Sequence, residues 1–503
     1  MPPLFSFCTE MKYILNHYYT LRHDKKRSYI ISPSDNSYEK PIPVNAGWVS
    51  RIHPAYAMML SFFAVPVELE DAYKSIAKFF SAPYSTISSF FEKLLTEKEP
   101  TYTTLCGHEN GFPINLIILE KEEFAIRHHY KPEDFVFEEL DLNTTRFLQA
   151  PLSIVFMPNN TCRTNCIYCY ADRKTKPSFL PFGIIERMIR EARELNIRDV
   201  LITGGDFFMY EKWEDLLKLL IHENYKPDLI STKVPINKAT IASFSKFNIR
   251  LQISLDSNTS SIASKVLGVS RAYTAKMRNS IYDIDKTNIR YQIATVLTSF
   301  NDSLIELEKL AFFIKTLSHI ERWEIRIAFS SLYTNTDFEE IKSRREQIEH
   351  VAIWIEQNRK NFPFEILWSP DEDHSYMTTK GGSRFFEGAA CSANLTNMVV
   401  LPDGAVTICE QLYWNQHFII GNINSNSISE IWNSQKALSL WRQRQEDIKE
   451  ESPCHHCLDF NDCFNASNRC YANIMKAYGM ANYDYPDPRC YLAPIFKNTI
   501  THD

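Results

Sequence analysis

Apolar residues in the middle of the chain alternate between strand-like runs and helical spacings. Ser153 to Met157 reads SIVFM, which is typical of a buried strand, and Phe182 to Leu195 repeats apolar residues three and four positions apart. The alternation continues through strand-like runs at 200–203, 228–232, 251–255, 291–297 and 323–329 and helical segments at 213–222, 239–247, 273–285, 304–317 and 338–357. This β-helix-β order predicts a parallel sheet with right-handed crossovers over residues 150–360. The six units favour an α/β fold built as an open, partial (β/α)6 barrel of the TIM type, with its chemistry at the C-terminal strand ends.

A different pattern precedes this core, in residues 1–145. Tyr13 to Ile31 predicts a β-hairpin, and three short helical stretches follow at 54–64, 69–80 and 85–95 before a strand-like run at 115–120. The last two helices are separated by SAPY, a break of the kind that joins a helix-turn-helix pair. Residues 1–145 are therefore expected to form an α+β, winged-helix-like domain.

The amino-acid composition and the predicted elements of the chain change again at residue 381. From there to residue 503 it is rich in Asn, Ser, Cys and short strands, and MVVLPDGAVTIC predicts a hairpin with a Pro-Asp-Gly turn. We therefore expect three domains, at 1–145, 150–360 and 381–503, which agrees with the number that a length of 503 residues suggests.

Composition narrows the class of protein. Hydrophobic residues make up 44% and aromatic residues 13%, enough for large cores, and the formal net charge of -6 argues against a general nucleic-acid binder. The N-terminus lacks a basic segment followed by an apolar one, and no apolar run approaches the roughly 18 residues that span a bilayer. A cytoplasmic protein that binds neither nucleic acid nor membrane is expected.

The 12 cysteines are clustered. Three lie between 162 and 169, seven lie between 391 and 490, and only Cys8 and Cys106 stand alone. In a large chain without a secretion signal, short cysteine spacings indicate metal ligands rather than disulfides.

The first cluster, Cys162, Cys166 and Cys169, has the spacing C-x3-C-x2-C and directly follows the first core strand. Three thiolates do not complete a structural zinc site, which normally has four protein ligands. They match three irons of a cubane cluster whose fourth iron is left open. The alternatives are a loop with incidental cysteines and three quarters of a zinc site.

This triplet resembles the cluster motif of the radical S-adenosylmethionine superfamily. The resemblance implies a 4Fe-4S cluster whose open iron binds S-adenosylmethionine, and electron transfer that releases a 5'-deoxyadenosyl radical. It also implies cofactor-binding positions near adenine, the methionine amino and carboxylate groups and the ribose. These are Tyr168, Gly204, Gly205 and Asp206 of the TGGD motif, Ser231, Ser254, Asp256 and Lys265. Each of them has the alternative of an ordinary turn or surface residue.

The C-terminal cysteines resemble the SPASM extension of the same superfamily. They follow the order Cys391, Gly404, Cys409, Cys454, Cys457, Cys463, Cys470 and Cys490. The resemblance implies up to two auxiliary 4Fe-4S clusters, one on Cys454, Cys457, Cys463 and Cys490 and a nearer one on Cys391, Cys409 and Cys470. Two departures put the nearer cluster's fourth ligand in doubt: the gap from Cys463 to Cys470 is longer than in the family, and no cysteine lies just before Cys391. By spacing alone a zinc ribbon fits Cys454 and Cys457 as well.

Glu410 directly follows Cys409. In the related anaerobic sulfatase maturases an aspartate follows the matching cysteine, and the resemblance implies that Glu410 is a general base for the substrate. The alternative is a solvated carboxylate.

Residues 54–97 resemble the PqqD-like leader-recognition domain of peptide-modifying relatives in their order of hairpin and helices. The resemblance implies that an extended leader peptide adds as a strand to the hairpin edge beside the third helix. The alternative is a helical cap on the barrel. A DNA-binding role is less favoured, because the candidate recognition helix SSFFEKLL has no net positive charge.

Together these resemblances imply a radical S-adenosylmethionine/SPASM oxidoreductase that abstracts hydrogen from a residue of a ribosomally made precursor peptide. The product would be a cross-link, a thioether or an oxidised residue, and the electron donor a flavodoxin or ferredoxin. The alternatives are a sulfatase-maturase-like protein oxidase, a catalytically inactive scaffold and, from another class, a zinc-stabilised winged-helix regulator.

Overall fold

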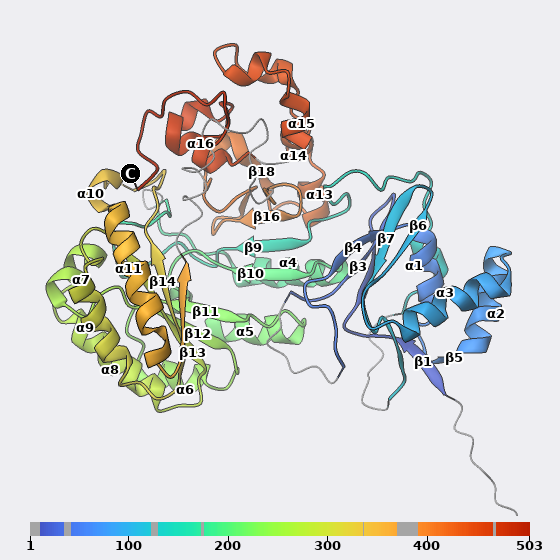
Figure 1. The fold of residues 1–503 in the computed structure, drawn as a ribbon, viewed down its shortest axis with the longest axis horizontal. Helices are drawn as coiled ribbons and strands as arrows, with labels where there is room; N and C mark the ends of the chain where they lie inside the picture. Colours follow the sequence, from blue (N-terminus) through green and yellow to red (C-terminus); the bar gives the residue numbers. More distant parts are fainter. Residues whose placement is uncertain are drawn as a thin grey trace, which may run out of the picture. The chain divides into compact units, whose positions relative to one another are not determined.

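The computed structural model describes residues 11–34, 42–121, 129–172, 176–334, 336–369, 391–465 and 469–502. The chain divides into two compact units, Met1–Leu152 with Glu194–Asp199 and Ser153–Arg193 with Val200–Asp503. Each unit is described by itself (Figure 1). The predicted start of a third domain at residue 381 lies outside the described residues, as does Cys8, and the division into three domains stays a prediction.

The first unit contains short strands around three helices. Its elements are β1 (Lys12–Leu15), β2 (Thr20–His23), β3 (Ser28–Ile31), β4 (Val49–Ile52), α1 (Pro54–Ser61), β5 (Val67–Glu68), α2 (Leu69–Phe80), α3 (Tyr84–Thr96), β6 (Thr101–Leu105), β7 (His108–Phe112), β8 (Ile117–Leu119) and a 3-10 turn at Pro132–Phe135. The three helices are those that the sequence predicts. They pack on one apolar core in which the rings of Tyr73 and Phe91 stack with centroids 5.6 Å apart.

The predicted hairpin from Tyr13 to Ile31 was partly wrong. β2 and β3 do form an antiparallel hairpin, with Leu21 opposite Ile30, and β4 adds to it as a third strand. The residues of β1 leave that hairpin and pair with β8 and β5. Because β1 and β8 are about a hundred residues apart in the chain, their pairing is set by tertiary packing and has no local sequence signal.

Buried charge ties the hairpin to the segment that ends the first unit. Arg27 Nε lies 3.2 Å from Asp24 Oδ2, and both side chains are fully buried. Asp24 also accepts hydrogen bonds from the backbone of Leu148 and Gln149, while Arg22 Nη1 donates to the carbonyl of Pro151 at 2.9 Å. The charges are thus compensated by partners, as buried ions require.

The second unit alternates strands and helices as the sequence predicts. Its elements up to residue 369 are β9 (Ser153–Phe156), α4 (Phe182–Glu194), β10 (Asp199–Ile202), α5 (Trp213–His222), β11 (Leu229–Thr232), α6 (Lys238–Phe244), β12 (Arg250–Ser254), α7 (Ser260–Leu267), α8 (Tyr273–Asp285), β13 (Tyr291–Leu297), α9 (Leu304–Ile314), β14 (Ile320–Ile327), α10 (Phe338–Ile341), α11 (Arg345–Asn358) and β15 (Glu365–Ser369). Those that follow are β16 (Asn397–Val400), β17 (Ala405–Thr407), β18 (Ile419–Asn422), α13 (Ile428–Trp432), α14 (Gln435–Trp441), α15 (Phe460–Asn465) and α16 (Tyr471–Tyr478).

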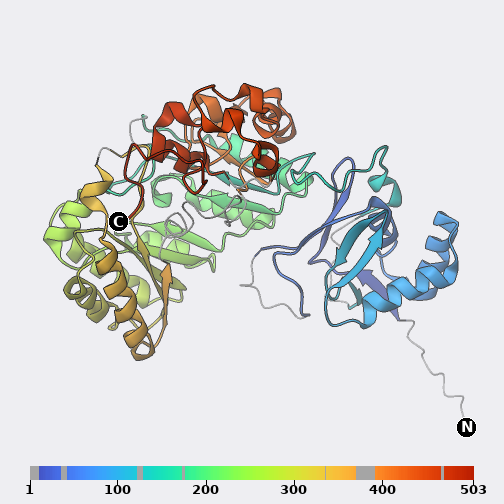
Figure 2. The same cartoon turned by 45° about the horizontal axis from the view of Figure 1, so that its top comes forward.

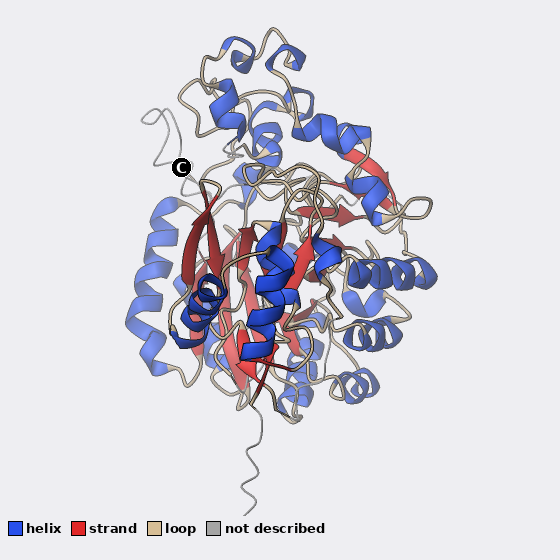
Figure 3. Cartoon of the chain, turned by 90° about the vertical axis from the view of Figure 1, so that its right-hand side faces the viewer, coloured by secondary structure: helices blue, strands red, loops and turns tan. Residues whose placement is uncertain are grey.

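Two five-stranded sheets organise this unit. One has the order β11-β12-β13-β14-β15, all parallel, and the other has the order β10-β9-β16-β17-β18. Helices α7, α8, α9 and α11 lie on the outer side of the first sheet (Figure 1), and Figure 3 shows the strands running between helices. Strands covered on both faces are buried along their length, as β13 is at six of its seven residues. The predicted α/β fold with an open barrel is confirmed.

The C-terminal segment continues the barrel sheet. β16 pairs in parallel with β9, placing Val400 opposite Phe156, and forms with β17 the antiparallel hairpin that the sequence predicts. Figure 2 shows the C-terminal elements (orange to red) beside this sheet. The first barrel strand therefore lies directly beside the hairpin that carries Cys409.

Some details of the second unit differ from the predictions. The single helix predicted at 338–357 is broken at Lys342, whose extended backbone (ψ 136°) separates α10 from α11. The helix α7 and the strand β15 were not predicted. Among the described residues, none of the helices has the length and apolar character needed to cross a bilayer.

Candidate functional site

The three core cysteines lie on the loop that leaves β9, at the C-terminal end of that strand. The backbone amides of Asn165 and Ile167 donate to the carbonyls of Leu267 and Val266 at 2.7 and 3.0 Å, which fixes the loop to the end of α7. The Cys169 amide donates to the Cys166 carbonyl at 3.2 Å. Cys162, Cys166 and Cys169 form no disulfide and are partly exposed, so this loop presents three ligands on a fixed backbone.

The glycines of the TGGD motif pack against this cysteine loop. Gly204 has φ +110°, and a Cβ at this position would lie 2.6 Å from the carbonyl oxygen of Asn159. The amides of Gly205 and Asp206 donate to the carbonyls of Asn159 and Thr161, both at 2.8 Å. Glycine is needed here because the backbone of one strand end approaches the backbone of the cysteine loop.

The carboxylate of Asp206 joins the ends of two strands. It accepts hydrogen bonds from Thr232 Oγ1 at 2.8 Å and from the Lys233 amide at 3.0 Å, and it caps the 3-10 turn at Phe207–Met209. Burial raises its pKa, and these hydrogen bonds act in the opposite direction. Asp206 therefore links β10 to β11, which belong to different sheets.

A buried network connects the cysteine loop to two further strand ends. The hydroxyl of Tyr168 donates to Asp256 Oδ2 at 2.5 Å, and Lys233 Nζ donates to the same oxygen at 3.2 Å and to the Tyr168 hydroxyl. The Lys233 ammonium also lies 4.9 Å from the centroid of the Tyr168 ring. Burial alone would lower the pKa of Lys233, but the charges of Asp256 and Cys166 hold it above its usual value. This lysine thus provides a fixed positive charge near the thiols.

The remaining predicted cofactor residues lie at strand ends or on α7. Ser254 is buried at the end of β12, and Ser231 on β11 accepts a hydrogen bond from Gln252 Nε2 at 3.2 Å. Lys265 is exposed on α7, with Nζ 3.6 Å from the centroid of the Phe300 ring. Of the two lysines, the structure brings Lys233 into the network beside Cys166, and the sequence signal for it was its position directly after β11.

Glu410 lies close to the residue that follows the core triplet. Burial and then the charge of Glu410 raise the pKa of Tyr170, so the segment after Cys409 lies near the segment after Cys169. Burial raises the pKa of Glu410, and the neighbouring Thr203 hydroxyl partly offsets this. A carboxyl that holds its proton more readily than usual is suited to accept one. Sequence reasoning missed Tyr170, whereas Thr203 is the first residue of the TGGD motif.

Aromatic rings pack together around the residues that follow Cys169 and Glu410. The Tyr170 ring lies 6.5 Å from that of Tyr413 and 5.9 Å from that of Phe329, and Tyr333 donates from its hydroxyl to the Leu412 carbonyl at 2.6 Å. Tyr413 is buried with a left-handed backbone (φ 42°), a conformation that costs about 1 kcal/mol or more in a non-glycine residue. The packing of Tyr413 therefore holds the chain after Cys409 in one conformation.

The C-terminal thiols gather in two groups. Burial raises the pKa of Cys409 to about 12 and that of Cys470 to about 11, and in both cases the charge of a neighbouring thiolate, including that of Cys391, adds to the effect. Cys391, Cys409 and Cys470 are thus close enough to repel one another when ionised. Deprotonating three such thiols requires a strong positive charge, which a metal supplies.

The second group contains Cys454, Cys457, Cys463 and Cys490. Burial raises the pKa of both Cys463 and Cys490 to about 11, and the charges of Cys454 and Cys457 add to it. These two groups contain the cysteines that the resemblance assigns to the nearer and the more distant auxiliary cluster, and that assignment stays a prediction.

A buried arginine accompanies the second group. Arg469 is 6% exposed, and its Nε and Nη1 have no hydrogen-bond partner among the described residues. Burial alone would lower its pKa, but the thiolates of Cys454 and Cys463 raise it. Unpaired buried donors are costly, and an anionic iron-sulfur cluster on these thiolates would satisfy them.

The chemistry of the donor set fits iron-sulfur clusters, which are held by cysteine thiolates. The residues present therefore fit the groups that the sequence predicts.

Two family models match the chain. The model of the radical SAM superfamily matches residues 156–314, and that of the SPASM iron-sulfur cluster-binding domain matches residues 391–458. A search of curated proteins finds no match.

Solved structures share the fold. The structure of SuiB from Streptococcus suis bound to its precursor peptide SuiA superposes with a TM-score of 0.62 and 15% identity, covering 96% of this chain and 100% of SuiB. SuiB bound to S-adenosylmethionine gives a TM-score of 0.60 and 16% identity over 95% of this chain and 98% of SuiB. At these low sequence identities, the match to SuiB shows a shared fold only.

The matched domains agree with the geometry of the thiols. The radical SAM match begins in β9 and covers the loop of Cys162, Cys166 and Cys169, and the SPASM match begins at Cys391. Both domains contain iron-sulfur clusters, so the cofactors are 4Fe-4S clusters and S-adenosylmethionine, and a zinc-stabilised regulator is not supported. The chain carries a radical SAM domain at residues 156–314 followed by a SPASM domain at residues 391–458, and these domains support the prediction of an enzyme.

Proposed function

We propose that this enzyme is a peptide maturase that abstracts a hydrogen atom from a residue of a ribosomally made precursor peptide. The product is a cross-link, a thioether or an oxidised residue. The observation that carries the proposal is the contact of Tyr170, which directly follows Cys169, with Tyr413, which lies three residues after Glu410: their ring centroids are 6.5 Å apart, so the segment after the core thiols meets the segment after Cys409.

Cys162, Cys166 and Cys169 hold the catalytic cluster in this proposal. When bound, the cluster and S-adenosylmethionine supply a 5'-deoxyadenosyl radical. Tyr168, Gly204, Gly205, Asp206, Ser231, Ser254, Asp256 and Lys265 form the cofactor pocket, and we add Lys233 to them. The partly buried ammonium of Lys233 is positioned to attract the methionine carboxylate, and its hydrogen bonds to Asp256 and Tyr168 hold it in place.

Glu410 takes the proton that leaves the substrate as its radical is oxidised. The aromatic rings of Tyr170, Tyr413 and Phe329 limit the access of water, which strengthens the interaction of this carboxyl with the substrate. Cys391, Cys409 and Cys470 hold the nearer auxiliary cluster, and Cys454, Cys457, Cys463 and Cys490 hold the more distant one. These clusters accept the electron that the product radical releases.

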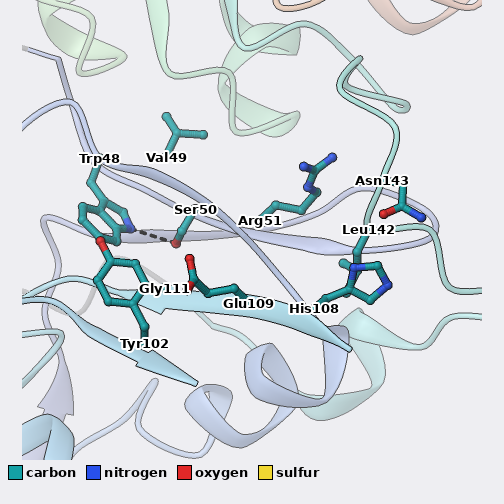
Figure 4. Close-up of a pocket in the computed structure, with 10 residues that line it drawn as sticks. All are labelled: Trp48, Val49, Ser50, Arg51, Tyr102, His108, Glu109, Gly111, Leu142 and Asn143. Carbon is teal, nitrogen blue, oxygen red and sulfur yellow. Dashed lines mark hydrogen bonds between the residues drawn. The ribbon is translucent and has the colours of Figure 1, made fainter. Parts of the chain in front are cut away.

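The first unit binds the leader of the peptide. A pocket of about 550 Å³ lies between β4 and β7, and in the described sheet order β4 has a paired neighbour on one side only (Figure 4). An extended peptide therefore has a free strand edge to pair with. The precursor peptide present in the SuiB structure supports a peptide as the substrate class.

The aromatic side of this pocket has a defined shape. Trp48 Nε1 donates to Ser50 Oγ at 2.8 Å, and the rings of Trp48 and Tyr102 lie 6.5 Å apart (Figure 4). Gly111 allows these rings to meet, because a Cβ there would lie 3.0 Å from Tyr102 and 3.3 Å from Trp48. The rings offer a leader side chain a rigid apolar contact beside the carboxylate of Glu109.

The proposal has requirements outside the chain. A flavodoxin or ferredoxin reduces the catalytic cluster. The free cysteines need a reducing compartment, which the cytoplasm provides. A protein oxidase of the sulfatase-maturase kind remains the second candidate, because Glu410 beside Cys409 would serve that reaction equally well.

Mass spectrometry of the small peptide encoded beside this gene, with and without co-expression of the enzyme, tests the proposal. We expect a mass change that requires the enzyme and disappears with Glu410→Gln. The same peptide should bind the full-length protein, and Val49→Pro in β4 should weaken binding, since proline removes a strand donor. A peptide that neither binds nor changes mass would count against a maturase and in favour of the protein oxidase.

A further inference from the structure

Arg469 lies directly before Cys470, a member of the first group of C-terminal thiols. It is 6% exposed, and its Nη2 donates to the Tyr485 carbonyl at 3.0 Å. The carbon of its guanidinium lies 5.8 Å from the centroid of the Tyr471 ring. These contacts hold the planar guanidinium in one orientation, so its remaining donors point in fixed directions.

Two nitrogens of this guanidinium are buried and have no hydrogen-bond partner among the described residues. They are Nε and Nη1. A buried charged donor that no acceptor satisfies is costly, and most buried polar groups in proteins have a partner. The two nitrogens therefore indicate an acceptor that the described part of the chain does not supply. A bound anion beside the guanidinium would supply it.

The side chain of Arg469 lies near thiols of the second group. Burial raises the pKa of Cys454 and of Cys463, and the charge of Arg469 acts against this rise in both cases. The backbone of Arg469, in contrast, continues into Cys470 of the first group. The positive charge is thus placed beside the thiols that are assigned to the more distant auxiliary cluster.

The two carboxylates near the second group have cations of their own. Asp484 Oδ1 lies 3.7 Å from Lys449 Nζ, and Asp487 Oδ1 lies 2.8 Å from Arg489 Nε. Among the ion pairs of the described residues, neither acid is paired with Arg469. The charge of Arg469 is therefore not cancelled by these acids and acts on whatever the thiols bind.

We infer that Arg469 donates hydrogen bonds from Nε and Nη1 to the cluster of the second group and raises its reduction potential. The inference rests on the proposed function and deepens it, because Arg469 then favours this group as the acceptor of the electron that the peptide radical releases. A positive charge and hydrogen bonds to the sulfurs stabilise the reduced, more negative form of an iron-sulfur cluster. Arg469 is a residue that sets a potential and does not touch the peptide.

Redox titration of the full-length protein with reconstituted clusters tests the inference, and it needs no peptide. The three cysteines of the core triplet are replaced with Ala, so that the electron paramagnetic resonance signals of the auxiliary clusters are recorded without overlap. The signal that disappears when Cys454 and Cys457 are also replaced with Ala belongs to the more distant cluster. The midpoint potential of that signal is then measured for each Arg469 variant.

We expect Arg469→Gln to reduce the ratio of reduced to oxidised cluster about tenfold at a fixed potential, which is a shift of about 59 mV for one electron. Arg469→Lys keeps the charge but loses the planar fork, so the ratio should fall only about threefold. Arg444→Met, which replaces an exposed arginine of the same unit, should leave the ratio unchanged. Iron content is measured in every variant, and all three should keep the iron of the parent protein.

An unchanged potential in iron-loaded Arg469→Gln would overturn the inference, and so would a parent protein that loses no signal when Cys454 and Cys457 are replaced. Loss of about four iron atoms in both Arg469→Gln and Arg469→Lys would also overturn it, because Arg469 would then hold the cluster without setting its potential. If only Arg469→Gln loses iron, Arg469→Lys decides, and an unchanged potential in that variant counts against the inference. The proposed function fails separately, because a shifted potential in Arg469→Gln would stand even if no peptide were modified.

Discussion

Tyr168 donates its hydroxyl proton to Asp256 across 2.5 Å, which joins the cysteine loop after β9 to the end of β12. Lys233 completes this contact from the end of β11, with its ammonium 3.2 Å from the same carboxylate. The Asp256 side chain is fully buried, and its other oxygen accepts from the Val296 amide at 2.9 Å. Three strand ends and the cysteine loop are therefore held together by one carboxylate.

Replacing this carboxylate should destabilise the enzyme and weaken cofactor binding. Asp256→Asn leaves the Lys233 ammonium largely buried without its partner, which we expect to cost roughly 2–4 kcal/mol. The measurements are the melting temperature and the affinity for S-adenosylmethionine. The double variant Lys233→Met with Asp256→Leu should lose less stability, because no charge remains buried. An unchanged melting temperature for Asp256→Asn would show that the hydrogen bonds of Asp256 with Tyr168 and Lys233 contribute little to stability.

A glycine substitution tests the packing of the TGGD motif on the cysteine loop. Gly204→Ala places a Cβ 2.6 Å from the Asn159 carbonyl at φ +110°, and we expect a loss of at least about 2 kcal/mol together with reduced iron content. Gly183→Ala is the matched control, because Gly183 lies in α4 and has open space around it. That change should be neutral or stabilising by up to about 1 kcal/mol. Equal behaviour of the two variants would contradict the tight packing.

These two sites also show what the sequence could and could not predict. Cysteine spacing and helical periodicity are local, so the three thiols after β9, the helices α1 to α3 and the hairpin of β16 and β17 could be predicted. The pairing of β16 with β9 and the ring contact of Tyr170 with Tyr413 join residues more than two hundred positions apart. No local pattern records which distant segments meet, and Lys233 accordingly looked like an ordinary strand-end residue.

Because the proposed role of Glu410 is to accept a proton from the peptide, its replacement should affect peptide modification but not the cleavage of S-adenosylmethionine. In Glu410→Gln, cleavage of S-adenosylmethionine should continue, because the core cysteines are untouched, while modification of the peptide falls about a hundredfold or more. Deoxyadenosine and modified peptide are quantified in the same reaction. Glu446→Gln, an exposed carboxylate of the same unit, serves as the control. Peptide modification at the wild-type rate in Glu410→Gln would remove this residue from the reaction.

His417 makes the stability of the second unit depend on pH. Burial, followed by the charge of Lys436, lowers the pKa of His417 to about 4, and its ring stacks on Tyr483 with centroids 3.8 Å apart. Because the unfolded chain binds this proton near pH 6.5 and the folded chain near pH 4, stability is complete above pH 6.5 and falls as the pH decreases toward 4. The loss amounts to at most about 3 kcal/mol.

Melting temperatures at pH 7.5 and pH 5.0 measure this dependence. His417→Phe keeps a stacked ring and removes the titration, so the wild type should lose several degrees more than the variant between the two pH values. Equal decreases in melting temperature for the wild type and for His417→Phe would mean that His417 does not titrate with the lowered pKa.

Iron content and deoxyadenosine formation after anaerobic reconstitution test the central claim most directly. With three clusters we expect about 12 iron atoms per chain, and deoxyadenosine when dithionite and S-adenosylmethionine are added. Replacing Cys162, Cys166 and Cys169 together by Ala should remove about four iron atoms and all deoxyadenosine, whereas Cys106→Ala, an exposed thiol outside both domains, should change neither. Protein that takes up zinc instead of iron, or that leaves S-adenosylmethionine intact when fully loaded with iron, would contradict the account.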